Sequence, residues 1–437
     1  MEQLSETTDV LVVGGGTAGV VAALQAARAG AKTTVVEATG QLGGTITNGG
    51  VCAPALFWSA DHQVIAGIGW ELVCRCKELD GTPWPPLRRS RAPRPSYHAA
   101  VNPYVYAAVA EELCLEAGVT LHYHEFIDGI RDAGGPWLAR TRGRGVERNI
   151  RAREVIDCTG DAIVIRQLGL AVERGDVVQP GTLEFRFRNM QVADLTEAQV
   201  DAAYRQALAD GRLHQGDFCY ADRSFMTFLR GTGFNLLHVF SADSSTAPLQ
   251  TDANIRGRAA VLRLLRFVQT LPGCRSATIE MMRPDTAVRE TVRIVGETRV
   301  TVDDYLAGRV FDDAVGYSIY FVDEHTRDGT SQRFLERGVV PTLPFGALIP
   351  RGSERVLTAG RAISADRLAH SALRIQCSCM VMGQAAGAAA ALGVQRAMPS
   401  RNVPLEDLRD LLRQHDAIIP PELRPLPELG PEAQPAA

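Results

Sequence analysis

The sequence contains almost no lysine. Lys32 and Lys77 are the only lysines among its 46 basic residues, so nearly all of the positive charge is carried by arginine. Lys32 directly precedes a β-branched run, and Lys77 lies at the polar end of a helix-like segment. Neither position suits the desolvated amine that Schiff-base chemistry needs, so catalysis through a lysine is not expected.

The chain also lacks a strong net charge. Its formal net charge is −4 over 437 residues, and basic residues are not interleaved with aromatic ones. A protein without a basic field or stacking platform does not recruit nucleic acid or an anionic membrane surface. We therefore expect neither as a partner.

Several other sequence features are missing. The nine cysteines include no C-x-x-C pair, and they are typical of reduced thiols in an intracellular protein. The first nine residues, MEQLSETTD, are polar and acidic where a signal peptide needs a basic and then an apolar segment. No apolar run is expected to reach membrane-spanning length. These absences predict a cytoplasmic protein with no membrane association, and we predict no metal site.

Glycine, by contrast, is abundant, and it is concentrated near the start in DVLVVGGGTAGVVAALQAARAGAKTTVVEATGQLGGTITNGG, residues 9–50. Residues 9–13 form a β-branched run of strand length, followed by glycines and an Ala-rich helical segment. Gly14, Gly16 and Gly19 supply G-x-G-x-x-G in the context that it requires. The first glycine allows the turn, the second lets the backbone approach a pyrophosphate, and the third packs the helix against the strand.

The residues around this turn complete an ADP-ribose site. Backbone N–H groups at the helix start, at Thr17 and Ala18, face the phosphates. Residues 32–36 predict the second strand, which ends at Glu37 about twenty residues after the glycines. A carboxylate there accepts hydrogen bonds from a ribose 2′-hydroxyl and disfavours a 2′-phosphate. This much fits NAD and FAD equally.

The segment after Glu37 favours FAD. It contains Gly43, Gly44 and Thr45 in a stretch too rich in glycine for a helix. This arrangement resembles the FAD-binding domain of the glutathione-reductase-like flavoproteins, in which E-x5-GG continues along the cofactor from the ribose toward the isoalloxazine. The resemblance implies that Ile127 lies near the adenine and that Gly160 and Asp161, in a T-G-D strand end, lie beside the cofactor.

Late segments extend the resemblance over most of the chain. LTAGRAISADRLAHSALRIQCSCMVMGQAAGAAAAL contains a strand that ends at Gly360 and Arg361, then a helix with Gly383 in its interior. A glycine inside a helix costs about 1 kcal/mol relative to alanine, so we expect close approach by the cofactor or by backbone at Gly383. The resemblance implies that this helix aims its N-terminus at the flavin N1–C2=O edge. Aromatic hydroxylases of related fold end the late strand with Gly-Asp, so Gly360-Arg361 counts against a flavin monooxygenase.

Taken together, the chain resembles an FAD-dependent oxidoreductase family of that superfamily, related to heterodisulfide-reductase flavin subunits and more distantly to fumarate-reductase-like and tRNA-uridine-modifying flavoproteins. We expect an α/β fold with a Rossmann-type FAD-binding domain and an inserted, sheet-containing substrate domain. The predicted ranges are 1–172 and 351–415 for the FAD-binding domain, 173–350 for the substrate domain and 416–437 for a disordered Pro-rich tail. The Pro- and Arg-rich stretch 81–96 predicts an extended surface loop, a lid or an oligomer contact.

Three side chains are candidates for catalysis. His325 in YFVDEH is the candidate base, with Asp323 as its orienting partner, because imidazole titrates near neutrality; a structural histidine is the alternative. Arg289 and Arg293 would share a face in either a helix or a strand, which suits a clamp for a carboxylate or a phosphate. Alternatively, they form salt bridges or bind the FAD pyrophosphate. Arg374, just before the late helix, is the candidate for the flavin or substrate carboxylate region.

The predicted function is a dehydrogenase or oxidase that moves a hydride from a small alcohol, amine or carbon–carbon single bond to flavin N5, with oxygen or a carrier as the electron acceptor. The other glycine segments, RTRGRGVERNI and RGTGFNLLHVF, are not followed by helices, so neither predicts a second nucleotide site. The alternatives are a flavin monooxygenase or NAD(P)H-dependent flavin reductase. An NAD-dependent Rossmann dehydrogenase and a flavoprotein without net substrate oxidation, such as a nucleic-acid-modifying one, are also considered.

Overall fold

The computed structural model describes residues 1–59, 61–85, 98–220 and 222–427. The predicted loop 81–96 lies outside these ranges from residue 86 onward, and so do residues 428–437 of the predicted tail.

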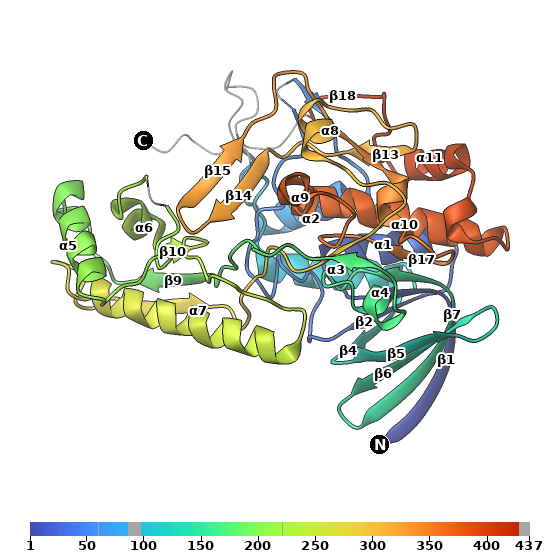
Figure 1. The fold of residues 1–437 in the computed structure, drawn as a ribbon, viewed down its shortest axis with the longest axis horizontal. Coiled ribbons are helices and arrows are strands. Elements are labelled where there is room, and N and C mark those ends of the chain that lie inside the picture. The colour runs from blue at the N-terminus through green and yellow to red at the C-terminus, as the bar shows by residue number, and fades with distance from the viewer. Residues whose placement is uncertain (60, 86–97, 221, 428–437) are drawn as a thin grey trace.

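The fold is built on a seven-stranded mixed sheet in the order β4-β2-β1-β7-β6-β5, with β17 also paired with β7. Strands β4, β2, β1, β7 and β17 are parallel, whereas β5 and β6 are antiparallel additions (Figure 1). The bounds are β1 (Glu2–Val13), β2 (Thr33–Glu37), β4 (Thr120–Tyr123), β5 (Phe126–Asp132), β6 (Trp137–Gly143), β7 (Val146–Asp157) and β17 (Val356–Thr358). This parallel core confirms the predicted Rossmann-type α/β class.

Two strand predictions are corrected. Strand β1 begins at Glu2, not residue 9, because its polar first half pairs with the start of β7. The sequence VTLHYHEFIDGI, residues 119–130, also predicts a single strand, but His124 has a φ of 58°, and the chain breaks there into β4 and β5. These two strands lie on opposite edges of the sheet. A single residue in the left-handed region is enough to redirect the chain.

Each face of the sheet has its own core. Val10 and Val12 of β1 pack in one cluster, and Leu11 and Val13 pack in another, as the alternation of a strand requires. The helices of the first face are α1 (Thr17–Arg28), α2 (Ile68–Asp80), α3 (Pro103–Glu116), α10 (Gln376–Gln395) and α11 (Leu405–Gln414), and α4 (Ile163–Gln167) covers the second. Asn102 caps α3 by accepting a hydrogen bond from Tyr104 N.

Helix α10 packs along α1 at backbone distance. A Cβ atom on Gly383 would lie 2.2 Å from the carbonyl oxygen of Ala18, and one on Gly387 would lie 2.3 Å from that of Ala22. Of the two explanations offered for Gly383, close approach by backbone is therefore the one observed. The prediction that no apolar run reaches membrane-spanning length is wrong, because α10 has 20 residues and a mean hydropathy of 1.5. Its apolar window is 94% buried, as in a core helix.

A second core lies within residues 183–288. Strands β10 (Gly233–Phe234), β9 (Phe185–Arg188) and β11 (Thr278–Met282) form an antiparallel sheet beside α5 (Glu197–Ala209), α6 (Met226–Gly231) and α7 (Ala247–Val268) (Figure 1). Phe185, Phe187, Phe225 and Phe228 fill its centre. Thr196 forms a capping box with Gln199 at the start of α5. The alternating sequence FNLLHVFSA, residues 234–242, predicts a strand, but the structure has β10 and a single bridge at Val239 there.

The rest of the predicted substrate domain packs on the FAD-binding part. Val300, Tyr305 and Leu348 belong to the first core. The elements here are β8 (Val172–Glu173), β12 (Arg293–Ile294), α8 (Val302–Leu306), β13 (Ala314–Tyr317), β14 (Val322–Thr326), β15 (Gly329–Arg333), β16 (Thr342–Pro344) and η1 (Phe345–Leu348). The range 173–350 thus contains two packing environments.

The chain ends with α9 (Arg367–Leu373), α10, η2 (Ser400–Asn402), α11 and β18 (Arg424–Pro425), which pairs with β3 (His62–Gln63). Ile418 and Ile419 are buried. The predicted disorder from residue 416 is therefore wrong for residues 416–427, because apolar side chains anchor them to the core.

Candidate active site

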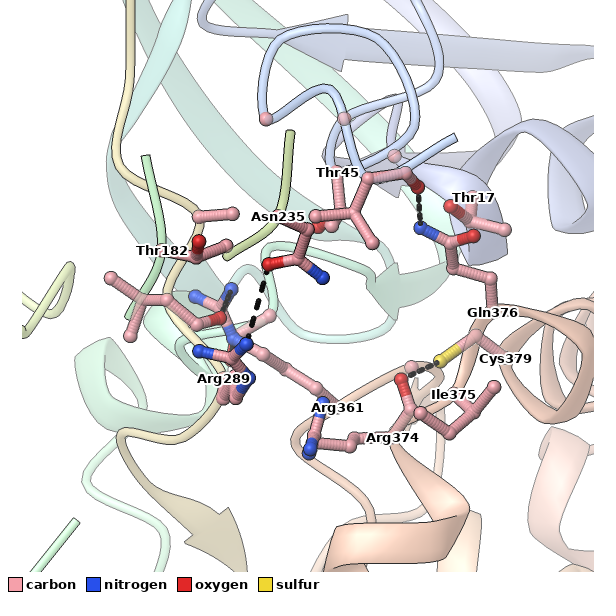
Figure 2. Close-up of a pocket in the computed structure, with 18 of the residues that line it drawn as sticks. Thr17, Thr45, Thr182, Asn235, Arg289, Arg361, Arg374, Ile375, Gln376 and Cys379 are labelled. Atoms are coloured by element: carbon pink, nitrogen blue, oxygen red, sulfur yellow. Dashed lines mark hydrogen bonds between the residues drawn. The ribbon is translucent and has the colours of Figure 1, made fainter. Parts of the chain in front are cut away.

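A cavity of ≈ 600 Å³ runs between the FAD-binding part and the second core. It extends from the Gly14–Gly16 turn past the N-terminus of α10 to the β14–β15 hairpin. Its volume falls within the range of about 300–1,000 Å³ typical of small-molecule and cofactor sites. Figure 2 shows side chains from both parts of the molecule converging on it.

The three glycines of the turn have different roles. A Cβ on Gly14, which has a φ of +99°, would lie 2.6 Å from the carbonyl oxygen of Cys158, and one on Gly19 would lie 1.9 Å from that of Gly14. Both positions exclude a side chain because backbone packs against them. A Cβ on Gly16 would meet only Gly44 Cα at 4.0 Å, and Gly16 lines the cavity. The space at Gly16 is thus available to a ligand at the N-terminus of α1.

Glu37 is held in place at the end of β2. Its Oε2 accepts a hydrogen bond from Gly15 N at 2.7 Å, and its Oε1 accepts from Thr39 N at 2.8 Å and Thr39 Oγ1 at 2.7 Å. A carboxylate has about four acceptor sites, so capacity remains for one hydroxyl donor. Glu37 lines the cavity, where the predicted ribose contact requires it.

The remaining predicted cofactor residues divide into two groups. Those that line the cavity are Thr17, Ala18, Gly44, Thr45, Gly160, Gly360 and Arg361. Those outside the lining are Gly19, Gly43, Ile127, Asp161 and Gly383. Gly43 bridges to Gly16, and Ile127 is in the second-face core. Asp161 Oδ1 accepts from Arg361 at 2.5 Å and from Thr291 at 2.7 Å, so it holds Arg361 in the wall.

The N-terminus of α10 opens on the cavity. Its N-cap residue, Ile375, supplies no side-chain cap, and Gln376 donates from Nε2 to Val51 O at 2.6 Å. Gln376 Oε1, Thr182 Oγ1 and Arg374 Nε are buried atoms of lining residues without a hydrogen-bond partner in the described part of the chain. Buried polar atoms are normally satisfied. Together with the open space at Gly16, these atoms fit a large polar cofactor such as FAD.

His325 lies in the cavity wall on β14, with both ring nitrogens engaged. Nε2 lies 3.0 Å from Asp323 Oδ2, as expected, and Nδ1 lies 2.8 Å from Nε2 of His238. Burial and the charge of Arg289 lower the pKa of His325 to about 4, although Asp323 opposes the shift. The expectation of an imidazole titrating near neutrality is therefore wrong. At pH 7 His325 is neutral, and Asp323 accepts from its Nε2–H.

The predicted pairing of Arg289 with Arg293 is also corrected. Both lie outside regular helix at this point, and Arg293 begins the two-residue strand β12. Arg293 turns into the protein and binds Glu290 at 2.5 Å and the carbonyl oxygen of Ala365 at 3.0 Å. Arg289 instead lines the cavity and donates to Pro180 O at 2.6 Å. It also donates to Asn235 Oδ1 at 3.4 Å (Figure 2). The irregular backbone between them removes the shared face.

Arg374 stands where the sequence predicted it, at the junction of α9 and α10. Its side chain is buried in the cavity wall, and it donates to Gln179 Oε1 and to the carbonyl oxygen of Asp323, both at 3.4 Å. His370 and Arg367, two other polar residues of α9, do not line the cavity. His370 Nε2 lies 2.6 Å from Arg361 O, and Arg367 pairs with Glu324.

Sequence reasoning missed His238, Asn235 and Gln179. His238 is a lone histidine in the apolar run NLLHVF, a signal that would have been compatible with a buried polar contact. Asn235 and Gln179 lie in loops and give no recognisable pattern. All three reach the site from segments far from β14 and α10 in sequence, so only the tertiary fold brings them there.

The turn, Glu37 and the cavity define a dinucleotide-binding α/β enzyme. A family model described as FAD dependent oxidoreductase matches residues 9–412. The chain belongs to this family, it is an oxidoreductase, and FAD is its cofactor.

Curated relatives match only a short segment. Glutathione reductase of Schizosaccharomyces pombe is 42% identical over 59 residues, 14% of this chain and 13% of that enzyme. Dihydrolipoyl dehydrogenase 2 of Arabidopsis thaliana is 51% identical over 51 residues, 12% of this chain and 10% of that enzyme. The matches are therefore restricted to a small fraction of each relative's length.

The solved structures that match this chain are only distantly similar to it. A geranylgeranyl bacteriochlorophyll reductase-like protein from Thermoplasma acidophilum has a TM-score of 0.43 and 14% identity, covering 94% of this chain and 83% of its own. The p-nitrophenol 4-monooxygenase from Pseudomonas putida DLL-E4 has a TM-score of 0.44 and 12% identity, covering 94% and 84%. At this distance neither structure is evidence for a particular activity.

Proposed function

We propose that the protein is an FAD-dependent dehydrogenase or oxidase that is reduced directly by a small organic substrate, an alcohol, an amine or a compound with an oxidisable carbon–carbon bond. The resemblance to flavin subunits of heterodisulfide reductases and to fumarate-reductase-like enzymes supports this class. FAD, when bound, supplies the acceptor for a hydride at N5. Oxygen or an electron carrier then takes the electrons.

The main support for the proposal is the structure of the two other glycine segments. Gly143 and Gly145 lie in the hairpin between β6 and β7, and Gly231 and Gly233 lie between α6 and the short strand β10. Neither segment is a strand followed by a turn and a helix, which is what a pyrophosphate site needs. The described residues thus supply one nucleotide site of this kind, and a separate site for NAD(P)H is not expected.

The chain's own residues offer a route for the substrate proton. Asp323 fixes the orientation of His325, and neutral His325 takes up a proton at Nδ1 when the hydrogen bond from His238 is exchanged for one from the substrate heteroatom. Asp323 then stabilises the imidazolium. Arg374 and the N-terminus of α10 place positive charge beside the same space.

A screen of alcohols, amines and organic acids under anaerobic conditions tests this proposal. We expect at least one compound to bleach the flavin absorption without any pyridine nucleotide. If flavin reduction instead requires NADH or NADPH, the alternative of a flavin reductase or monooxygenase replaces the proposal.

A further inference from the structure

Two arginines with little exposed surface, Arg289 and Arg374, line the cavity. The side chain of Arg374 is 10% exposed and residue Arg289 is 8% exposed. Burial lowers the pKa of both guanidinium groups, and the charge of Arg374 adds to the effect on Arg289, whose pKa falls to about 10. Both therefore carry a full charge at neutral pH. Arg289 makes hydrogen bonds only to uncharged oxygens, and Arg374 keeps a buried Nε without a partner in the described chain. Buried cations are costly unless an anion compensates them.

The carboxylates around this pair leave one positive charge without compensation. Asp323 is shared, since it lies 3.7 Å from the Arg374 guanidinium and 3.0 Å from His325. Glu290 is bound to Arg293 at 2.5 Å, and the nearby Glu324 pairs with Arg367. These seven charged groups comprise four arginines and three carboxylates, and His325 is neutral. The cluster is thus one negative charge short of neutrality.

We propose that Arg289 and Arg374 bind the carboxylate of the substrate, which is a small organic monoanion. This inference rests on the proposed function and narrows its substrate class. Arginine presents a planar fork of donors that matches a carboxylate. The amide Nδ2 of Asn235 and the unpartnered hydroxyl of Thr182 lie in the same wall and can complete the donor set.

The position of Arg289 favours a substrate over the FAD phosphates. Figure 2 shows Arg289 with Thr182 and Asn235 on one side of the cavity, whereas Thr17, at the pyrophosphate turn, lies on the other side. Pro180 lies just before the second core and Asn235 lies within it, so both contacts of Arg289 are on the side of that core. The His98 and Tyr320 rings, whose centroids lie 5.9 Å apart, also line this cavity.

An anion bound by Arg289 and Arg374 would also make His325 a stronger base. Arg289 and Arg374 each depress the pKa of His325, in addition to the effect of burial. A carboxylate between the guanidiniums would offset their field, so the pKa of His325 would rise toward the physiological range when substrate binds.

Calorimetric titration of the oxidised holoenzyme tests the inference without turnover, with benzoate and acetate as probes and benzamide and acetamide as uncharged isosteres. We expect a carboxylate to bind and its amide to bind at least roughly tenfold more weakly. Arg289→Gln should weaken carboxylate binding by roughly 30-fold or more, the effect typical of removing one partner of a buried charge pair. Arg230→Gln, a matched change at a side chain that is 67% exposed, should have no effect.

Flavin absorbance and thermal unfolding must accompany each titration. Equal binding of acid and amide by the wild-type protein overturns the inference, and this comparison needs no variant to fold. So does unchanged carboxylate affinity in Arg289→Gln. Loss of FAD from a folded Arg289→Gln protein would assign the guanidinium to the cofactor phosphates. In each case the proposed function stands if an uncharged substrate still reduces the flavin.

Discussion

Nε2 of His238 lies 2.8 Å from Nδ1 of His325, and the rings meet at 74°. Because Asp323 fixes Nε2 of His325, this contact occupies the one ring nitrogen from which His325 can accept a proton. Both imidazoles are neutral at pH 7, since burial and Arg289 hold each pKa well below its usual value. His238 thus occupies the acceptor nitrogen of the proposed base.

Replacing His325 with Gln should keep FAD bound but slow flavin reduction by substrate by roughly 100-fold or more, the usual loss when a general base is removed. His238→Gln should slow it less and shift the pH profile, because it alters only the partner of Nδ1. Anaerobic stopped-flow measurements at several pH values distinguish the two. If His325→Gln reduces its flavin at the wild-type rate, His325 is a structural histidine.

We expect His325 to lower the free energy of unfolding of the protein at acid pH. Its pKa is about 4 in the folded protein against 6.5 as the ordinary value, so between these pH values the unfolded chain binds a proton that the folded chain does not. The free energy of unfolding therefore falls as pH drops from 6.5 toward 4, by on the order of 3 kcal/mol for this group. Denaturant unfolding of wild type and His325→Gln should show a shallower acid loss in the variant. Parallel curves would contradict the shifted pKa.

Gly16 and Gly19 of the turn have very different surroundings, so substitutions at these two positions form a matched pair. Gly16→Val should fold and lose FAD affinity by roughly 10- to 100-fold or more, because its side chain enters space that only a ligand fills. Gly19→Ala should instead destabilise the fold, because its Cβ meets Gly14 O. Flavin content and unfolding temperature separate the effects. A flavin-replete Gly16→Val protein would mean that the turn does not bind the pyrophosphate.

The contact between α1 and α10 is a separate test of the packing. Gly383→Ala should lower the free energy of unfolding by about 1–3 kcal/mol or more, the cost of overpacking a close backbone contact. Gly129→Ala in β5 is the control, since its Cβ would meet only Arg140 Nη2 at 3.8 Å. Denaturant unfolding curves should move for Gly383→Ala and not for Gly129→Ala. Equal stability of both variants would show that the helices are not so close.

The nucleotide half of the site was predictable from sequence because its determinants are local. Gly14, Gly16 and Glu37 lie on one strand–turn–helix–strand unit, and their spacing fixes their geometry. The other half, which we propose binds the substrate, was only partly predictable. Asp323 and His325 are neighbours on one strand, but Arg289 was paired with the wrong arginine because an irregular backbone has no periodicity to read.

Long-range effects account for the other differences. The low pKa of His325 depends on burial and on Arg289, which enters from a segment with no local relation to β14. His124 ended a strand through a backbone angle that its residue type does not specify. Residues 416–427 are ordered because Ile418 and Ile419 find a core made by other segments, despite their proline-rich neighbours.

Direct reduction by the organic substrate is the central claim, and anaerobic stopped-flow mixing of the oxidised protein with NADH and with NADPH tests it most directly. The account predicts no flavin bleaching at a catalytically useful rate with either nucleotide, because the two other glycine segments end in a hairpin and a short strand. Rapid bleaching with either nucleotide would contradict the account and would make the protein a flavin reductase or monooxygenase.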